Sequence, residues 1–91
     1  MMVSVRKVQW LGGHRLRVWF SDGAVGEWDH SDILNAAGPI ALPLHDPAYF
    51  GRVFLEMGAL TWPNGYDVCP EHLHGLLRDA GALKSAGVAA E

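Results

Sequence analysis

The chain has 91 residues, of which 49% are hydrophobic and 19% charged, with a net charge of −3 and one cysteine. This length suits one small domain with one modest core, and a single cysteine excludes an internal disulfide. Charges, Gly or Pro interrupt the longest apolar stretches, which excludes a transmembrane helix. Arg6 and Lys7 interrupt the basic-then-apolar plan of a secretory signal, so we expect a cytoplasmic protein with no membrane association.

The charges are unevenly divided along the chain. The first 17 residues carry bases and no acid, and residues 21–32 carry acids and no base. The bases are Arg6, Lys7, Arg15 and Arg17, and the acids are Asp22, Glu27, Asp29 and Asp32. This distribution excludes a generic binder of polyanions. A basic strip beside an acidic one suits a charge-complementary protein surface.

Three consecutive strands are predicted in the first third of the chain. They run over Val3 to Leu11, His14 to Phe20 and Ala24 to Asp29, separated by turns at Gly12-Gly13 and Ser21-Asp22-Gly23. Alternation within the second strand places Leu16, Val18 and Phe20 on one face and Arg15, Arg17 and Trp19 on the other. Because the turns are short, we expect an antiparallel meander.

Helix-start signals follow the meander. Asp29 or Ser31 would cap a short helix that runs to about Ala37 and ends at Gly38-Pro39. Residues 38–45 then form an apolar loop. Asp46-Pro47 begins a further helix, with the carboxylate at the cap and the proline in the first turn.

The sequence leaves residues 52–57 open between helix and strand. The helix that starts at Asp46-Pro47 could continue to Met57, because Phe50, Phe54 and Met57 fit one helical face. Residues 52–56 and 59–62 also fit two strands hinged at Met57-Gly58. We favour a short helix followed by this second hairpin.

The last predicted elements are a turn and a helix. Trp62 to Asp67 reads Trp-Pro-Asn-Gly-Tyr-Asp, which combines a restricted proline with an Asn-Gly turn. Pro70 to about Ala80 is predicted as an amphipathic helix with Leu73, Leu76 and Leu77 on one face. The sequence thus predicts an α+β fold with a three-stranded meander, a second hairpin and two or three short helices. It forms one domain over residues 1–80, followed by a flexible Ala/Gly-rich tail over 81–91.

Several of these residues match a known family pattern. They are Leu16-Arg17-Val18-Trp19-Phe20-Ser21-Asp22-Gly23, Asp46, Phe50, Val53, Gly58, Leu60, Trp62-Pro63-Asn64-Gly65, Asp67, Pro70 and Leu73. Over roughly residues 3–77 the chain resembles the small bacterial proteins of the domain of unknown function 2442 family. The Phe-x-Asp-Gly turn alone is a weak signal, and its combination with the Trp-Pro-Asn-Gly-x-Asp run is more specific.

The resemblance implies a small α+β domain with an antiparallel sheet, short helices and no established catalytic residues. It further implies an antitoxin-like partner, encoded beside another small protein in a pair that resembles a toxin–antitoxin module. Some relatives carry an extra helix-turn-helix for DNA. This chain has no room for that element, which argues against direct promoter binding.

Metal, cofactor and catalytic sites are not predicted. Cys69 and His72 have a workable spacing for two zinc ligands, but only the distant His14, His30 or His45 could complete the set. Nothing in the sequence supplies an orienting group or an oxyanion hole for a nucleophilic Cys69. The carboxylates have simpler expected roles: Asp22 in a turn, Asp29 and Asp32 at a helix start, and Asp67 on backbone N–H groups. We therefore expect no enzyme activity.

The Trp62 segment is expected to be mainly structural. Trp62 is predicted to lie in the core with its indole N–H on a backbone carbonyl. Pro63, Asn64 and Gly65 shape the turn. If that turn is exposed, Asn64 and Tyr66 become contact residues for a partner.

The strip of Arg15, Arg17 and Trp19 is the main predicted partner-binding surface, because Trp and Arg are favoured anchors in protein interfaces. The alternative is that Arg15 or Arg17 stacks on Trp10, Trp19 or Trp28 within a second cluster. The sequence predicts a non-catalytic interaction module for a small protein partner. Nucleic-acid binding through the basic strand, or inhibition of a larger complex by a mobile-element-encoded protein, remain alternatives. An exposed sheet edge also permits a homodimer.

Overall fold

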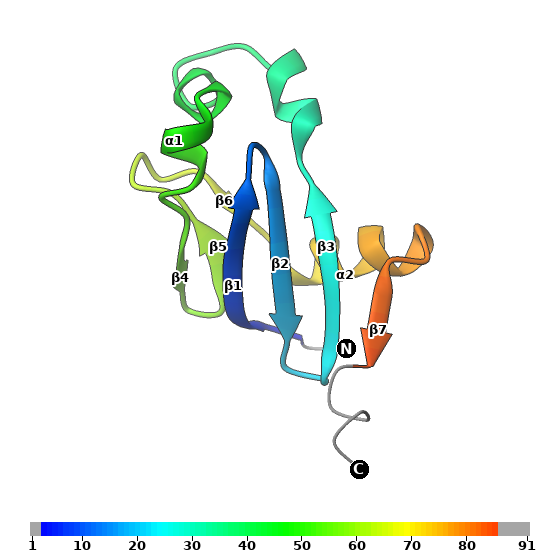
Figure 1. Ribbon diagram of the computed structural model, residues 1–91. Coiled ribbons are helices and arrows are strands. Elements are labelled where there is room, and N and C mark those ends of the chain that lie inside the picture. Colours follow the sequence, from blue (N-terminus) through cyan, green and yellow to red (C-terminus); the bar gives the residue numbers. More distant parts are fainter. Residues whose placement is uncertain (1–2, 86–91) are drawn as a thin grey trace.

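The main element of the computed structural model, which describes residues 3–85, is a four-stranded antiparallel sheet (Figure 1). Strands β1 (Val5–Gly12), β2 (Arg15–Phe20) and β3 (Ala24–Asp29) form the predicted meander. A further strand, β7 (Leu83–Ser85), pairs with β3, so that the strand order is β1-β2-β3-β7. The predicted α+β class with an N-terminal meander is confirmed.

The first turn of the meander lies one residue later than predicted. Gly12 pairs with Arg15 in the ladder, so the loop consists of Gly13 and His14 rather than of Gly12-Gly13. His14 therefore lies outside β2. In the second turn, Asp22 accepts a hydrogen bond at Oδ1 from the Ala24 N–H at 3.0 Å, as expected of a turn carboxylate.

The second hairpin is present and forms a separate three-stranded sheet. Its strands are β4 (Phe54–Glu56), β5 (Ala59–Thr61) and β6 (Asp67–Val68), in the order β4-β5-β6. Residues 54–56 are thus strand, and the favoured interpretation is confirmed. The N–H of Val5 donates to the carbonyl of Gly58 at 2.7 Å, which joins the second sheet to the start of β1.

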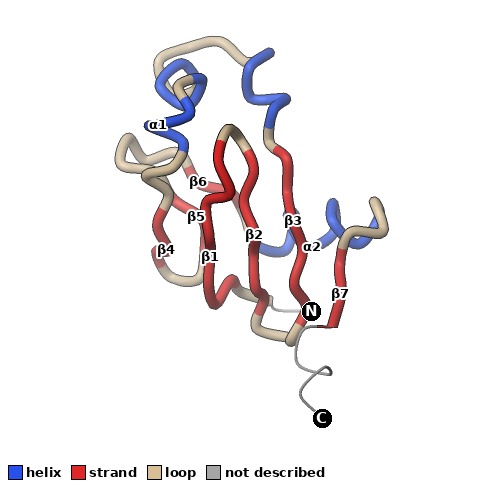
Figure 2. The backbone as a smooth tube through the Cα atoms, in the orientation of Figure 1, coloured by secondary structure: helices blue, strands red, loops and turns tan. Residues whose placement is uncertain are grey.

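The helices of the described chain are short and lie between strands along the sequence (Figure 2). They are two 3-10 helices, η1 (Ser31–Asn35) and η2 (Leu42–His45), and two α-helices, α1 (Pro47–Phe50) and α2 (Pro70–Asp79). Asp46 caps α1 by accepting the Ala48 N–H at 3.1 Å, as predicted. The expected loop over 38–45 is wrong in part, because η2 forms there. Its Leu44 is fully buried, and this burial holds the apolar segment against the core.

The buried face of α2 differs from the predicted one. Leu73 and Leu77 are buried, but Leu76 is 45% exposed and His74 takes its place in the interior. His74 Nε2 lies 2.8 Å from Asp22 Oδ2, and its ring packs edge-on against Phe20. A buried imidazole is tolerated here because its ring nitrogen has a carboxylate partner.

The strand β7 replaces the first part of the expected flexible tail. After α2, Gly81 has a φ of 71°, which turns the chain back toward the sheet. The Ala82 N–H then donates to the Leu77 carbonyl at 2.8 Å, and Leu83 packs against the core. Three ladder residues are too few to leave a periodic signal in the sequence. The domain therefore extends to Ser85, and the rest of the predicted tail lies outside the described residues.

The core lies on one side of the four-stranded sheet. Its largest fully buried side chains are Trp62, Phe50, Leu16, Leu44, Leu60, Leu73 and Val18. Trp62 donates its indole N–H to the Phe50 carbonyl at 2.9 Å, as predicted. In the described part of the chain, α2 covers this inner face and no helix covers the opposite one (Figure 1). Among these residues no helix combines the length and apolar composition that a membrane span requires.

Candidate protein-interaction surface

The outer face of the four-stranded sheet begins with the alternation of β2. Leu16, Val18 and Phe20 are buried, whereas Arg15 is exposed and Arg17 and Trp19 are half-buried. The predicted division of β2 into a core face and an outer face is therefore confirmed. The structure brings the first three predicted contact residues together on one open surface.

Glu27 orders the two arginines of this surface. Arg15 Nη2 donates to Glu27 Oε1 at 2.6 Å, and Arg17 Nη2 donates to Glu27 Oε2 at 2.7 Å. The hydrogen bond from Arg17 is the main cause that holds the pKa of Glu27 below its ordinary value. All three side chains are exposed enough for solvent to screen these pairs, so they contribute little to stability. The two ion pairs instead hold both guanidinium groups in position over the sheet.

The aromatic side chain of this surface, Trp19, makes a cation–π contact with a lysine. Lys7 Nζ lies 4.8 Å from the centroid of the Trp19 ring, and Lys7 is the cross-strand neighbour of Trp19. The alternative prediction, in which Arg15 or Arg17 stacks on a tryptophan, is not what the structure shows. Trp28 lies on the inner face, where it is buried and stacks on His30 at 4.1 Å.

Cross-strand neighbours extend the surface over all four strands. Trp19 pairs with Val25, and Val25 pairs with Lys84 of β7. A cleft of about 530 Å³ lies here, lined by Arg17, Trp19, Val25, Gly26, Glu27, Ala82 and Lys84. We call this outer surface the basic face, and its charged residues are Lys7, Arg15, Arg17, Lys84, Glu27 and Asp29. Four bases against two acids leave two excess positive charges on a chain whose net charge is −3.

The other two predicted contact residues lie elsewhere and are engaged within the fold. Asn64 Nδ2 donates to the Ile40 carbonyl at 2.9 Å, and its Oδ1 accepts the Tyr66 N–H at 3.2 Å. The Tyr66 hydroxyl lies 3.0 Å from His30 Nε2. Asn64 and Tyr66 thus connect the Trp62–Asp67 turn to neighbouring segments, and they do not join Arg15, Arg17 and Trp19.

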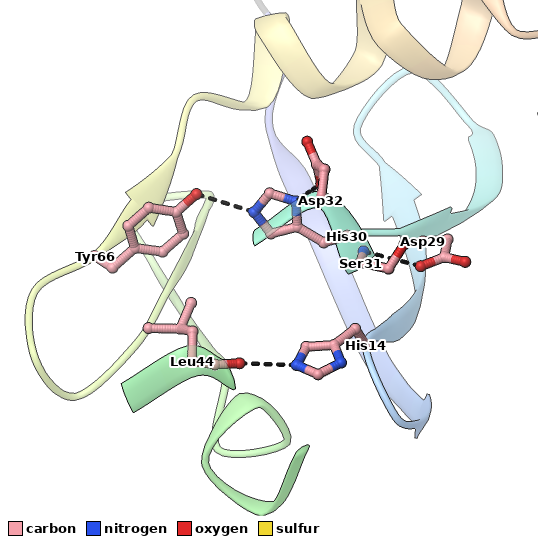
Figure 3. A network of polar contacts seen from close by, with 7 residues as sticks. All are labelled: His14, Asp29, His30, Ser31, Asp32, Leu44 and Tyr66. Carbon is pink, nitrogen blue, oxygen red and sulfur yellow. Dashed lines mark hydrogen bonds and ion pairs between the residues drawn. The ribbon is translucent and has the colours of Figure 1, made fainter. Parts of the chain in front are cut away.

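A polar network surrounds the buried side chain of His30 (Figure 3). His30 is 8% exposed, and its Nδ1 lies 2.7 Å from Asp32 Oδ1. Because an ionised carboxylate can only accept, Nδ1 carries the proton and Nε2 accepts from the Tyr66 hydroxyl. Burial lowers the pKa of His30, opposed by Asp32, and burial raises the pKa of Tyr66. No sequence signal pointed to this network, since its parts come from segments 36 residues apart.

The order carboxylate, imidazole and hydroxyl is also that of an acid–base relay in hydrolases. In such a relay the imidazole removes the proton of the hydroxyl as it attacks, and burial raises the pKa of the Tyr66 hydroxyl, which makes this transfer less favourable. The side chains of this network line neither the cleft on the basic face nor a second, smaller cleft beside the β4–β5 hairpin. The contacts of His30 with Asp32 and Tyr66 connect η1 to the turn before β6.

Two other histidines, His14 and His45, also form hydrogen bonds within the fold. His14 Nε2 lies 2.8 Å from the Leu44 carbonyl, and His45 Nε2 lies 2.9 Å from the Ala36 carbonyl. Since a carbonyl only accepts, each of these nitrogens donates. Cys69 is an exposed free thiol just before α2. Over residues 3–85, no three His, Cys, Asp or Glu side chains are grouped so that they could hold a metal ion.

Comparison with known proteins identifies the family. A family model described as protein of unknown function (DUF2442) matches residues 5–78. The chain belongs to this family. No curated protein and no solved structure matches the chain. The match spans β1 to β3, the Trp62–Asp67 turn and most of α2, and it stops before β7, which contributes Lys84 to the basic face.

Proposed function

We propose that this protein is a non-catalytic interaction module that binds a small acidic protein through the basic face. The observation that carries the proposal is Trp19, half-buried on an open sheet face with an excess of positive charge. Burial of an aromatic anchor supplies affinity, and complementary charge around it supplies orientation and speeds association. Arg15 and Arg17 are already held by Glu27, which reduces the entropy lost when a partner binds.

The charges on the basic face favour a protein partner over a nucleic acid. Glu27 accepts a hydrogen bond from one nitrogen of each of two arginines, and Asp29 adds a second carboxylate to the same face. The negative charges of a phosphate backbone would be repelled by both carboxylates, Glu27 and Asp29. A folded partner with a mixed but mainly acidic surface can place bases opposite them.

We propose more specifically that this module has the antitoxin-like role that the family resemblance implies. In that role the partner is a small protein encoded beside this one, and binding to the basic face covers the surface through which the partner is toxic. Expression of the partner alone would then arrest growth, and co-expression with this chain would relieve the arrest. A Trp19→Ala variant would fail to relieve it.

The test is a set of pull-downs from the native host with matched variants. Tagged wild type, Trp19→Ala, Arg15→Ala/Arg17→Ala and the control Arg78→Ala are compared, each with and without nuclease. Arg78 is an exposed arginine on α2, away from the basic face. We expect wild type and Arg78→Ala to retain one protein in stoichiometric amount after nuclease treatment. The two basic-face variants should lose about 10-fold or more of it.

Thermal unfolding separates lost contacts from lost structure, because the basic-face side chains are outside the core and their replacement should leave the melting temperature nearly unchanged. Recovery of nucleic acid alone, or of proteins that nuclease removes, would contradict the proposal. Equal retention of the partner by Trp19→Ala and wild type would show that the assigned face is wrong.

A further inference from the structure

The three-stranded sheet also has an open outer face. Strand pairing places Phe54 opposite Thr61 and Glu56 opposite Ala59, with Asp67 also opposite Thr61. The alternate residues Leu60 and Val68 are buried, and Thr61 is buried as well, so the exposed residues of this face are Phe54, Glu56 and Asp67. A cleft of about 340 Å³ lies on this outer face, lined by Glu56, Met57, Ala59, Thr61, Gly65 and Asp67. Its lining includes two acids and no base. Asp67 was expected to bond backbone N–H groups, and it lies exposed here instead.

Met57, at the tip of the β4–β5 hairpin, is in an unusual position. Its side chain is 98% exposed, and its φ of 53° lies in the left-handed region. It is the one residue other than glycine with a positive φ among residues 3–85. Asn or Gly fits this turn position with less strain than Met does. No contact within the described chain accounts for a fully exposed methionine here.

We propose that the hairpin tip of one copy docks on the basic face of a second copy. The two faces have opposite charge, and each offers an apolar group: the half-buried Trp19 on the basic face and the exposed Met57 at the hairpin tip. Glu56 and Asp67 would lie against Arg17 and Lys84, and the thioether of Met57 would pack on the Trp19 ring, a favourable contact for sulfur. Lys84 is exposed, and over residues 3–85 no carboxylate forms an ion pair with it.

This contact joins two different patches, so it is heterologous and extends from copy to copy unless the geometry closes a ring. Both clefts are small and exposed, so the association should be weak and should decrease as salt screens the charges. It covers the same face as the proposed partner. A tighter-binding partner would therefore displace the second copy.

Sedimentation velocity of the purified full chain, from micromolar to millimolar concentration, tests this contact. We expect the wild type to self-associate with rising concentration and to dissociate at high salt. Glu56→Lys and Lys84→Glu should each remain monomeric. An equal mixture of these two variants should form a one-to-one dimer, because one retains an intact basic face and the other an intact hairpin tip. Asp79→Lys and Arg78→Glu carry the same charge changes on α2 and should associate like the wild type.

A Met57→Asn variant provides a second test, because its expected combination of higher stability and weaker self-association cannot result from unfolding. Asn relieves the strain of the turn and should raise the free energy of unfolding, while loss of the thioether should weaken self-association about 10-fold. A wild type that is monomeric at all concentrations would overturn the proposal. So would a variant mixture that stays monomeric, or variants that associate like the wild type. None of these results affects the partner proposed above, which is tested on host proteins with the Trp19 and arginine variants.

Discussion

The imidazole of His30 contacts a carboxylate through one nitrogen and a phenol through the other, and Trp28 stacks on its ring. Asp32, Asp29, His14 and Tyr66 are the titratable groups that face it. Burial is the largest influence and lowers the pKa of His30 below 6.5, although Asp32 acts in the opposite direction. The folded protein therefore binds a proton at His30 less readily than the unfolded chain does.

This difference predicts a pH dependence of stability. Below pH 6.5 the unfolded chain takes up a proton at His30 before the folded protein does, so the free energy of unfolding should fall as the pH is lowered to the folded-state pKa. Urea denaturation at a series of pH values measures the effect. Asp32→Asn should steepen the fall, because it removes the carboxylate that raises the pKa of His30. His30→Gln should remove this part of the fall.

The exposed His72 provides the control for this prediction. His72→Gln should retain the wild-type dependence on pH, whereas His30→Gln should not. If wild type and His30→Gln show the same slope just below pH 6.5, His30 does not carry the effect.

At the scale of elements, Gly26 shows how α2 and β7 lie against β3. A Cβ at Gly26 would be 3.0 Å from the Ala82 carbonyl oxygen and 3.2 Å from side-chain atoms of both Leu77 and Leu83. The nearest of these atoms belongs to the backbone and cannot move aside as a flexible side chain can. A glycine within β3 thus lets the turn after α2 approach the sheet closely.

Two glycine substitutions should therefore have opposite effects. Gly26→Ala should lower the free energy of unfolding by about 1–3 kcal/mol, since it forces the connection between α2 and β7 away from the sheet. Gly75→Ala should raise it by about 0.5–1 kcal/mol, because Gly75 is inside α2 and its added Cβ meets only Arg78 Nη2, at 3.7 Å. Urea denaturation followed by circular dichroism measures both. A neutral Gly26→Ala would mean that this connection does not constrain β3.

At the scale of the whole molecule, the two sheets and four short helices of residues 3–85 share one core, and β7 closes this part of the structure beside β3. The pairs Ala24–Ser85, Val25–Lys84 and Gly26–Leu83 connect the end of the described chain to its first third. Helix α2 thereby becomes an internal element between two strands of the molecule. Stability should depend on residues that, by sequence alone, resemble a tail.

Truncation tests this dependence directly. A chain that ends at Ala80 loses the β7 ladder and the half-buried Leu83, and its free energy of unfolding should fall by about 1–3 kcal/mol. A chain that ends at Ser85 is the control, which isolates the contribution of β7. Thermal unfolding measures both. If the chain ending at Ala80 melts at the same temperature as the chain ending at Ser85, the β3–β7 pairing contributes nothing to stability.

The sequence by itself determined the features that depend on neighbouring residues. Alternation in β2 separated Leu16 from Arg15 and Arg17, the Asp46-Pro47 pair marked the start of α1, and Met57-Gly58 marked a hairpin. The core position of Trp62 also followed from its apolar indole and its local turn. Such signals extend over a few residues, so side-chain chemistry and spacing suffice to recognise them.

Only the tertiary structure decided which distant segments meet. The His74–Asp22 pair joins residues 52 positions apart, and Lys84 reaches Val25 through a strand of three residues. The cost of closing such long loops is repaid by contacts between the segments, and no local pattern records those contacts. Alternation in β2 predicted that the Trp19 side chain lies on the face opposite the core. The placement of α2 on the inner face, together with the pairing of β7, decided that Trp19 lies open in a basic cleft.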